Sequence, residues 1–134
     1  MKNLMNRVLL ALVGMVFVLA SCGKYDGGPG LSLATKKGRI SRTWVPASSD
    51  DVNGNVTTYN GSEFTITYDK DGTVTYTLPV FGASTGTWEL NSDKTAITTT
   101  FNGSTDTSDP IYRLTSKDLW FKDVDGTIFK YKAQ

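Results

Sequence analysis

The 134-residue chain has no histidine and a single cysteine, Cys22. Without histidine, Ser-His-Asp and Cys-His nucleophile systems and histidine-ligated metal sites are excluded. Paired carboxylates are the remaining route to acid–base catalysis. Only Glu63 and Glu89 fall within expected strands, and their alternation places both on the polar face. We therefore expect a protein that is not an enzyme and that uses no metal or cofactor.

The chain also lacks an apolar run long enough to cross a bilayer, which takes about 20 residues. Its apolar stretch, residues 8–19, follows the charged residues Lys2 and Arg7 and ends in the small residues Ala20 and Ser21. A charged start, a short apolar region and small residues at the cleavage point are typical of a secretory signal peptide. Cys22 is the next residue, and an ordinary signal peptide with a chance cysteine is the alternative.

The segment Leu19-Ala20-Ser21-Cys22 resembles the lipobox of bacterial lipoproteins. This resemblance implies that residues 1–21 are removed and that Cys22 becomes the acylated first residue. At about 0.8 kcal/mol per buried CH₂, two or three acyl chains hold a protein firmly on a membrane that it does not span. We expect a lipid-anchored protein of the bacterial cell envelope, in the outer membrane, on either the periplasmic leaflet or the cell surface.

The rest of the chain has neither a strong charge nor a second cysteine. Residues 22–134 hold 12 basic and 13 acidic side chains, which gives no electrostatic case for binding nucleic acid. Residues 22–30 are rich in glycine and form an expected flexible tether. Residues 31–134 are the length of one domain, and with Cys22 acylated this domain cannot form an internal disulfide.

The start of this domain predicts a short helix or turn at one end of the fold. Leu33, Lys37, Ile40 and Trp44 have the spacing of one helical face. Four basic residues cluster here, Lys36, Lys37, Arg39 and Arg42. They fit either a solvated face or an attraction to anionic lipid headgroups beside the tether.

From Thr43 onward, apolar and polar residues alternate with the period of β-strands. Eight strands are expected, or nine if residues 56–59 form one, with a longer polar loop over residues 102–109. Most of the other connections are two to five residues rich in Asp, Asn and Gly, which is typical of hairpins. The pattern predicts an all-β fold, an antiparallel up-and-down meander that closes into a barrel.

Two of these turns, residues 69–72 and 123–126, continue into Thr as Asp-x-Asp-Gly-Thr. Calcium loops begin in a similar way but need a bidentate Glu several residues later, and neither segment supplies an acid there. We therefore interpret both as hairpin turns, with Gly72 and Gly126 at positive φ.

Large aromatic side chains share the expected inner face of the barrel. They either fill a dry core or line a pocket in which Tyr hydroxyls orient a mostly apolar ligand. The candidate ligand-binding residues are Trp44, Phe64, Tyr68, Tyr76 and Trp88.

Several segments of the chain resemble the small lipocalin-like lipoproteins of Gram-negative bacteria: residues 28–33, 36–44, 71–73, 86–90, 114–120 and 125–126. The resemblance implies an eight-stranded barrel with an early tryptophan, Trp44, near its closed end. Lipocalins carry Gly two residues before that tryptophan, whereas this chain has Arg42. The resemblance therefore carries over no binding residue beyond Trp44.

Two functions from different classes follow. The first is a membrane-anchored, non-catalytic binding module for a small apolar or amphipathic ligand. The second is an accessory protein with a filled barrel that contacts a protein partner in the envelope. A cavity that reaches solvent distinguishes them.

Overall fold

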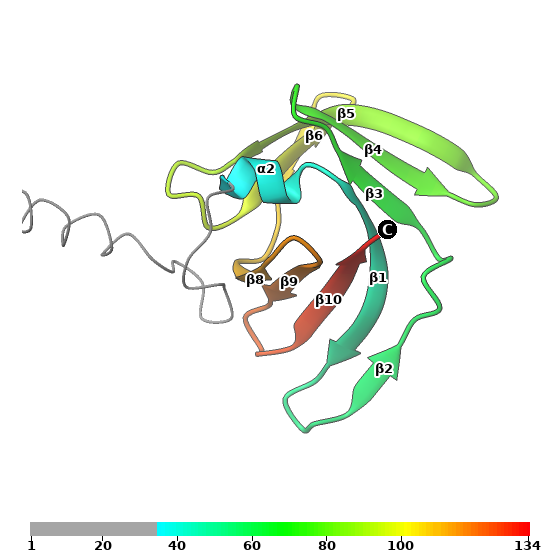
Figure 1. The fold of residues 1–134 in the computed structure, drawn as a ribbon, viewed down its shortest axis with the longest axis vertical. Helices are drawn as coiled ribbons and strands as arrows, with labels where there is room; N and C mark the ends of the chain where they lie inside the picture. The colour runs from blue at the N-terminus through cyan, green and yellow to red at the C-terminus, as the bar shows by residue number, and fades with distance from the viewer. Residues whose placement is uncertain (1–34) are drawn as a thin grey trace, which may run out of the picture.

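The computed structural model describes residues 35–134, which form ten antiparallel strands and the short helix α2 (Lys36–Ile40) (Figure 1). The expected signal peptide, Cys22 and the tether lie outside the described residues. The strands are β1 (Thr43–Asp50), β2 (Val56–Thr58), β3 (Thr65–Tyr68), β4 (Thr73–Leu78), β5 (Gly82–Leu90), β6 (Ile97–Phe101), β7 (Ser104–Thr107), β8 (Ile111–Leu114), β9 (Asp118–Lys122) and β10 (Ile128–Ala133). The one helix of this region is too short to cross a bilayer.

All ten strands belong to one strongly curled sheet (Figure 1). Nine follow the order β7-β6-β5-β4-β3-β1-β10-β9-β8, and β2 pairs with β1 beside this path. The first and last strands pair, with Trp44 opposite Ala133, so the meander returns on itself. The prediction of an all-β antiparallel meander is confirmed. The sheet is nevertheless not closed, because β7 and β8 form its two ends, and ten strands replace the expected eight or nine.

The extra strand β7 lies where the sequence predicts a loop over residues 102–109, and that prediction is wrong for residues 104–107. Asn102 and Gly103 both have positive φ, 50° and 80°, as a tight two-residue hairpin requires. The strand contains only Ser, Thr and Asp, so it shows no apolar alternation. Threonine pairs across β6 and β7 join it instead, with hydroxyl oxygens 2.9 and 3.1 Å apart.

The two Asp-x-Asp-Gly-Thr segments are hairpin turns, as predicted. Gly72 and Gly126 have φ of 92° and 95°. Within each turn, the second aspartate accepts a hydrogen bond from the backbone N–H of the following threonine at 2.8 Å. Within residues 35–134, no three metal-ligating side chains are grouped so that they could hold an ion.

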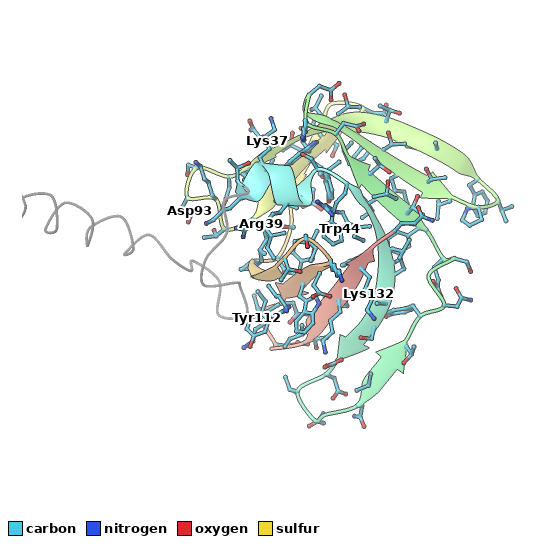
Figure 2. The ribbon with its side chains drawn as sticks, viewed as in Figure 1. Lys37, Arg39, Trp44, Asp93, Tyr112 and Lys132 are labelled. Carbon is cyan, nitrogen blue, oxygen red and sulfur yellow. The ribbon has the colours of Figure 1, made fainter. Side chains whose placement is uncertain are left out.

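Helix α2 covers one end of the curled sheet, as expected for the predicted short helix or turn. Thr35 caps it, because its hydroxyl accepts a hydrogen bond from the Gly38 N–H at 3.0 Å. Ile40 is fully buried, and its carbonyl accepts a hydrogen bond from Trp44 Nε1 at 2.9 Å. Figure 2 shows Trp44 beside the helix, and this contact joins α2 to the start of β1.

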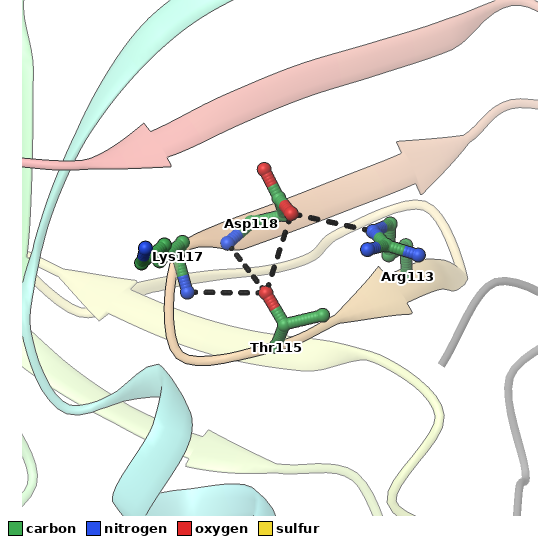
Figure 3. Close-up of polar contacts among 4 residues, drawn as sticks. All are labelled: Arg113, Thr115, Lys117 and Asp118. Carbon is green, nitrogen blue, oxygen red and sulfur yellow. Dashed lines mark hydrogen bonds and ion pairs between the residues drawn. The ribbon is translucent and has the colours of Figure 1, made fainter. Parts of the chain in front are cut away.

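The turn between β8 and β9 lies at the same end and is held by side chains (Figure 3). The Thr115 hydroxyl accepts hydrogen bonds from the backbone N–H groups of Lys117 and Asp118 at 3.1 and 2.9 Å. Arg113 Nε donates to the Asp118 carboxylate at 3.3 Å. Arg42 donates to the Ser116 carbonyl at 2.6 Å, so the residue that replaces the lipocalin glycine fixes this turn to the end of α2.

Candidate binding cavity

The inward-facing tryptophans are part of the core. Trp44 is fully buried and Trp88 is 4% exposed. Both indole N–H groups have partners, since Trp44 donates to the Ile40 carbonyl and Trp88 donates to the Asp69 carbonyl at 2.8 Å. Trp88 packs edge-on against Tyr68, with ring centroids 5.1 Å apart. Trp44 also forms part of a cavity wall, whereas Trp88 lines none of the cavities described here.

The first cavity, of about 210 Å³, lies inside the curl of the sheet. Its walls come from inward-facing residues of four strands: Trp44, Ile66, Tyr68, Leu119, Phe121, Phe129 and Tyr131. Ser108 and Asp109, which connect β7 to β8, complete the lining. The cavity is therefore bounded on one side by the gap between the two ends of the sheet.

A second cavity, of about 250 Å³, adjoins the first, and Phe129 and Tyr131 line both. Its other walls are Pro46, Ser48, Tyr59, Glu63, Phe64 and Lys130. The loop that returns from β2 to β3 supplies Tyr59, Glu63 and Phe64. The Glu63 carboxylate orders this loop by accepting hydrogen bonds from the backbone N–H groups of Asn60 and Gly61 at 3.1 and 3.0 Å.

Aromatic rings make up much of the wall between the cavities. The centroid of Phe64 lies 5.1 Å from that of Tyr76 and 6.2 Å from that of Tyr131, and Phe121 lies 5.9 Å from Tyr131. Tyr76 itself lines a separate hollow with Phe101. The predicted binding residues are thus divided: Trp44 and Tyr68 line the first cavity, Phe64 lines the second, and Tyr76 contacts Phe64 from behind.

The Tyr68 hydroxyl is the polar group that distinguishes this cavity from an ordinary core. Tyr68 is only 7% exposed, yet its hydroxyl makes no hydrogen bond with residues 35–134. The one buried side-chain oxygen without a partner in this region is Asp50 Oδ1, so the Tyr68 hydroxyl faces open space, not packed atoms. Burial raises the pKa of Tyr68, and the nearby Tyr131 adds to the rise.

Tyr131 brings further phenol groups to the same place. Burial raises the pKa of Tyr131, and its proximity to Tyr76 and Tyr59 raises that pKa further. Tyr68 and Tyr131 line the first cavity, and Tyr59 and Tyr131 line the second. Their hydroxyl groups can each donate or accept a hydrogen bond.

Sequence reasoning found only part of this lining. Tyr131 shares the inner face with the predicted residues, and the alternation of β10 was sufficient to find Phe129 as well. Phe121 alternates in the same way on β9. The sequence did not indicate three other lining residues, Tyr59, Ser108 and Asp109. They lie in connections between strands, and the position of a connection depends on the whole fold.

The comparisons with known proteins bear on the fold. No protein-family model matches the sequence, and no curated protein is significantly similar to it. Among solved structures, the chain is similar to a lipocalin-like protein from Bacteroides uniformis, with a TM-score of 0.53 and 14% sequence identity. The match covers 72% of this chain and 100% of the other. The fold is lipocalin-like, as the resemblance implied.

Proposed function

We propose that this protein is a membrane-anchored, non-catalytic binding module that holds a small, mostly apolar ligand with one hydrogen-bonding group. The observation that carries the proposal is the Tyr68 hydroxyl, which faces a cavity without a partner in residues 35–134. The hydroxyl faces open space and is not among the buried atoms of residues 35–134 without a partner. A ligand that hydrogen-bonds to it gains about 0.5–1.5 kcal/mol net and buries its own apolar surface against the aromatic walls.

The size of the cavities limits the ligand. Pockets for drug-sized molecules have about 300–1,000 Å³. The two cavities have about 210 and 250 Å³ and share Phe129 and Tyr131 in their walls. A single ring or a short chain fits one of them, so we expect a ligand much smaller than a porphyrin or a bile acid.

The anchor is proposed from Cys22, which precedes the described residues. Acyl chains on Cys22 would hold the domain at the bacterial outer membrane, with the choice of leaflet open. Helix α2 starts at Lys36, 14 positions after Cys22. A fully extended segment of that length reaches at most about 50 Å, so the cavity works within a short distance of the bilayer.

The proposal is tested with the full chain in nanodiscs of phosphatidylcholine, screened against small aromatic and aliphatic alcohols, amides, amines and acids. Binding is detected by saturation-transfer NMR, with empty nanodiscs as the blank. Ile66→Phe fills the first cavity and should abolish binding. Thr65→Phe adds the same ring to the opposite face of β3 and should leave binding unchanged.

Tyr68→Phe removes the hydroxyl and keeps the ring. Loss of one neutral hydrogen bond, worth about 0.5–1.5 kcal/mol, should weaken the bound compound roughly 2- to 12-fold. If no compound binds, or if Ile66→Phe binds as well as the wild type, the proposed function is wrong.

The second candidate is an accessory protein that contacts an envelope partner through its outer surface. The observation in its favour is the turn between β4 and β5, where Val80 and Phe81 are 85% and 86% exposed. Large apolar side chains at such exposure indicate a contact surface when they adjoin one another. Absence of ligand binding together with loss of an envelope complex on Phe81→Ser would favour this function over the first.

A further inference from the structure

The cavity walls consist mostly of the faces and edges of aromatic rings. Phe64, Phe121, Phe129 and Tyr131 line one or both cavities. The face of such a ring carries a partial negative charge and attracts a cation placed within about 6 Å of its centroid. The outer face of the same sheet already shows this contact, since Lys130 Nζ lies 4.5 Å from the Trp120 ring centroid.

The charged side chains that line the two cavities are mostly acidic. They are Asp109 in the first cavity, and Glu63 and Lys130 in the second. Lys130 brings no positive charge into the cavity, because its ammonium lies on the outer face and pairs with Asp50 Oδ2 at 2.6 Å. The charged groups that remain at the cavities are therefore the carboxylates of Asp109 and Glu63.

Further carboxylates lie next to Asp109. The Lys122 N–H donates to the Pro110 carbonyl at 3.0 Å, which brings the turn that starts at Asp123 beside Asp109. The side-chain hydrogen bond with Asp125, burial, and the charges of Asp125 and Asp109 raise the pKa of Asp123. Lys122 is the base nearest in sequence, and its ammonium lies 5.3 Å from the Tyr112 ring centroid on the outer face. An anionic ligand that enters beside Asp109 would meet repulsion, and a cation would meet attraction.

We infer that the ligand is a small organic cation, an aromatic or alkyl amine, held by the aromatic walls and by the carboxylate of Asp109 in the first cavity, with Glu63 adding negative charge at the second. This inference rests on the proposed function and narrows its ligand to one charge class. The Tyr68 hydroxyl oxygen can accept a hydrogen bond from the ammonium group, and Asp109 supplies the opposite charge at the gap in the sheet. The charge of Asp109 would repel fatty acids and other carboxylates.

The test uses three probes of nearly equal shape at pH 7: 2-phenylethylamine as the cation, 2-phenylethanol as the neutral molecule and 3-phenylpropanoate as the anion. The full chain in phosphatidylcholine nanodiscs is titrated with each probe by saturation-transfer NMR. The ring contacts and the opposite charge of Asp109 should make the amine bind about tenfold more tightly than the alcohol. The carboxylate should show no saturable binding.

Asp109→Asn removes the charge and keeps the shape of the side chain. It should weaken the amine several-fold and leave the alcohol unchanged, and Glu63→Gln should act in the same direction from the second cavity. The matched control is Glu89→Gln, which removes one charge from an exposed residue on β5 outside both cavities.

Equal or tighter binding of the alcohol or the carboxylate would overturn the inference and leave the proposed function standing. Equal amine affinity in Asp109→Asn, Glu63→Gln and the wild type would overturn it as well. If none of the three probes, nor any compound of the wider screen, binds to the wild type, both the inference and the proposed function fail.

Discussion

Replacing Tyr68 with Phe tests the central structural observation without any ligand. The side chain is 7% exposed and packs against Trp88, and its hydroxyl has no partner within residues 35–134. Phe keeps the ring contacts. At pH 7 the variant should therefore unfold with a free energy within about 1 kcal/mol of the wild type, because no protein hydrogen bond is lost.

The difference should appear at alkaline pH. Burial and the nearby Tyr131 raise the pKa of Tyr68 above its ordinary value of 10.0. As the pH rises, the unfolded chain therefore releases the Tyr68 proton before the folded chain does. The contribution of Tyr68 to the free energy of unfolding is complete below pH 10 and falls as the pH rises towards the pKa in the folded state. One pH unit above the pKa of tyrosine in the unfolded chain, this effect lowers the free energy of unfolding of the wild type by about 1.4 kcal/mol. Tyr68→Phe has no hydroxyl here and escapes that loss.

The assay is urea unfolding at pH 7 and pH 11, followed by tryptophan fluorescence with linear extrapolation to water. From pH 7 to pH 11, the free energy of unfolding should fall by about 1 kcal/mol less in Tyr68→Phe than in the wild type. Tyr112→Phe, which changes a half-exposed tyrosine on the outer face, is the control and should follow the wild type. Parallel stability curves for Tyr68→Phe and the wild type would refute the placement of this hydroxyl in a desolvated site.

Three other predictions use different parts of the chain. Gly86→Ala should destabilise the fold by about 1–3 kcal/mol in thermal unfolding, because its Cβ would lie 2.2 Å from the Thr100 carbonyl oxygen; unchanged stability would contradict this packing. Gly72→Val and Gly126→Val should each cost about 1–3 kcal/mol, because β-branched residues resist positive φ, whereas a calcium chelator should leave the wild-type melting temperature unchanged. Cys22→Ser should give a chain without acyl groups, and a wild-type Cys22 found unmodified by mass spectrometry would overturn the anchor.

The success of the fold prediction depended on local patterns. The alternation of Ile66 and Tyr68 fixes which side of β3 faces inward, and Gly72 and Gly126 fix the turns, because only short-range geometry is involved. The missing strand β7 was also a local matter. Asn102-Gly103 is a strong hairpin signal, but strand prediction based on apolar residues overlooks a strand stabilised by threonine hydroxyls.

The binding site was harder to predict than the fold. The aromatic residues of the candidate site share an inner face, yet alternation cannot tell a wall from a filled core. Trp88 is buried, and its indole N–H donates to the Asp69 carbonyl. Tyr68, which packs against Trp88, instead directs its hydroxyl into open space. The difference depends on the shapes of side chains from four strands, and no local pattern contains it.

The sequence by itself determined the all-β class, the hairpin connections and the inward-facing residues, since period-two alternation and turn chemistry act between neighbours in the chain. Only the tertiary structure decided three other features. These are the gap between β7 and β8, the cavity beside Tyr68, and the position of Asp109 at that gap. Each depends on how the sheet curls and where distant strands meet, which the packing of side chains across the whole core determines.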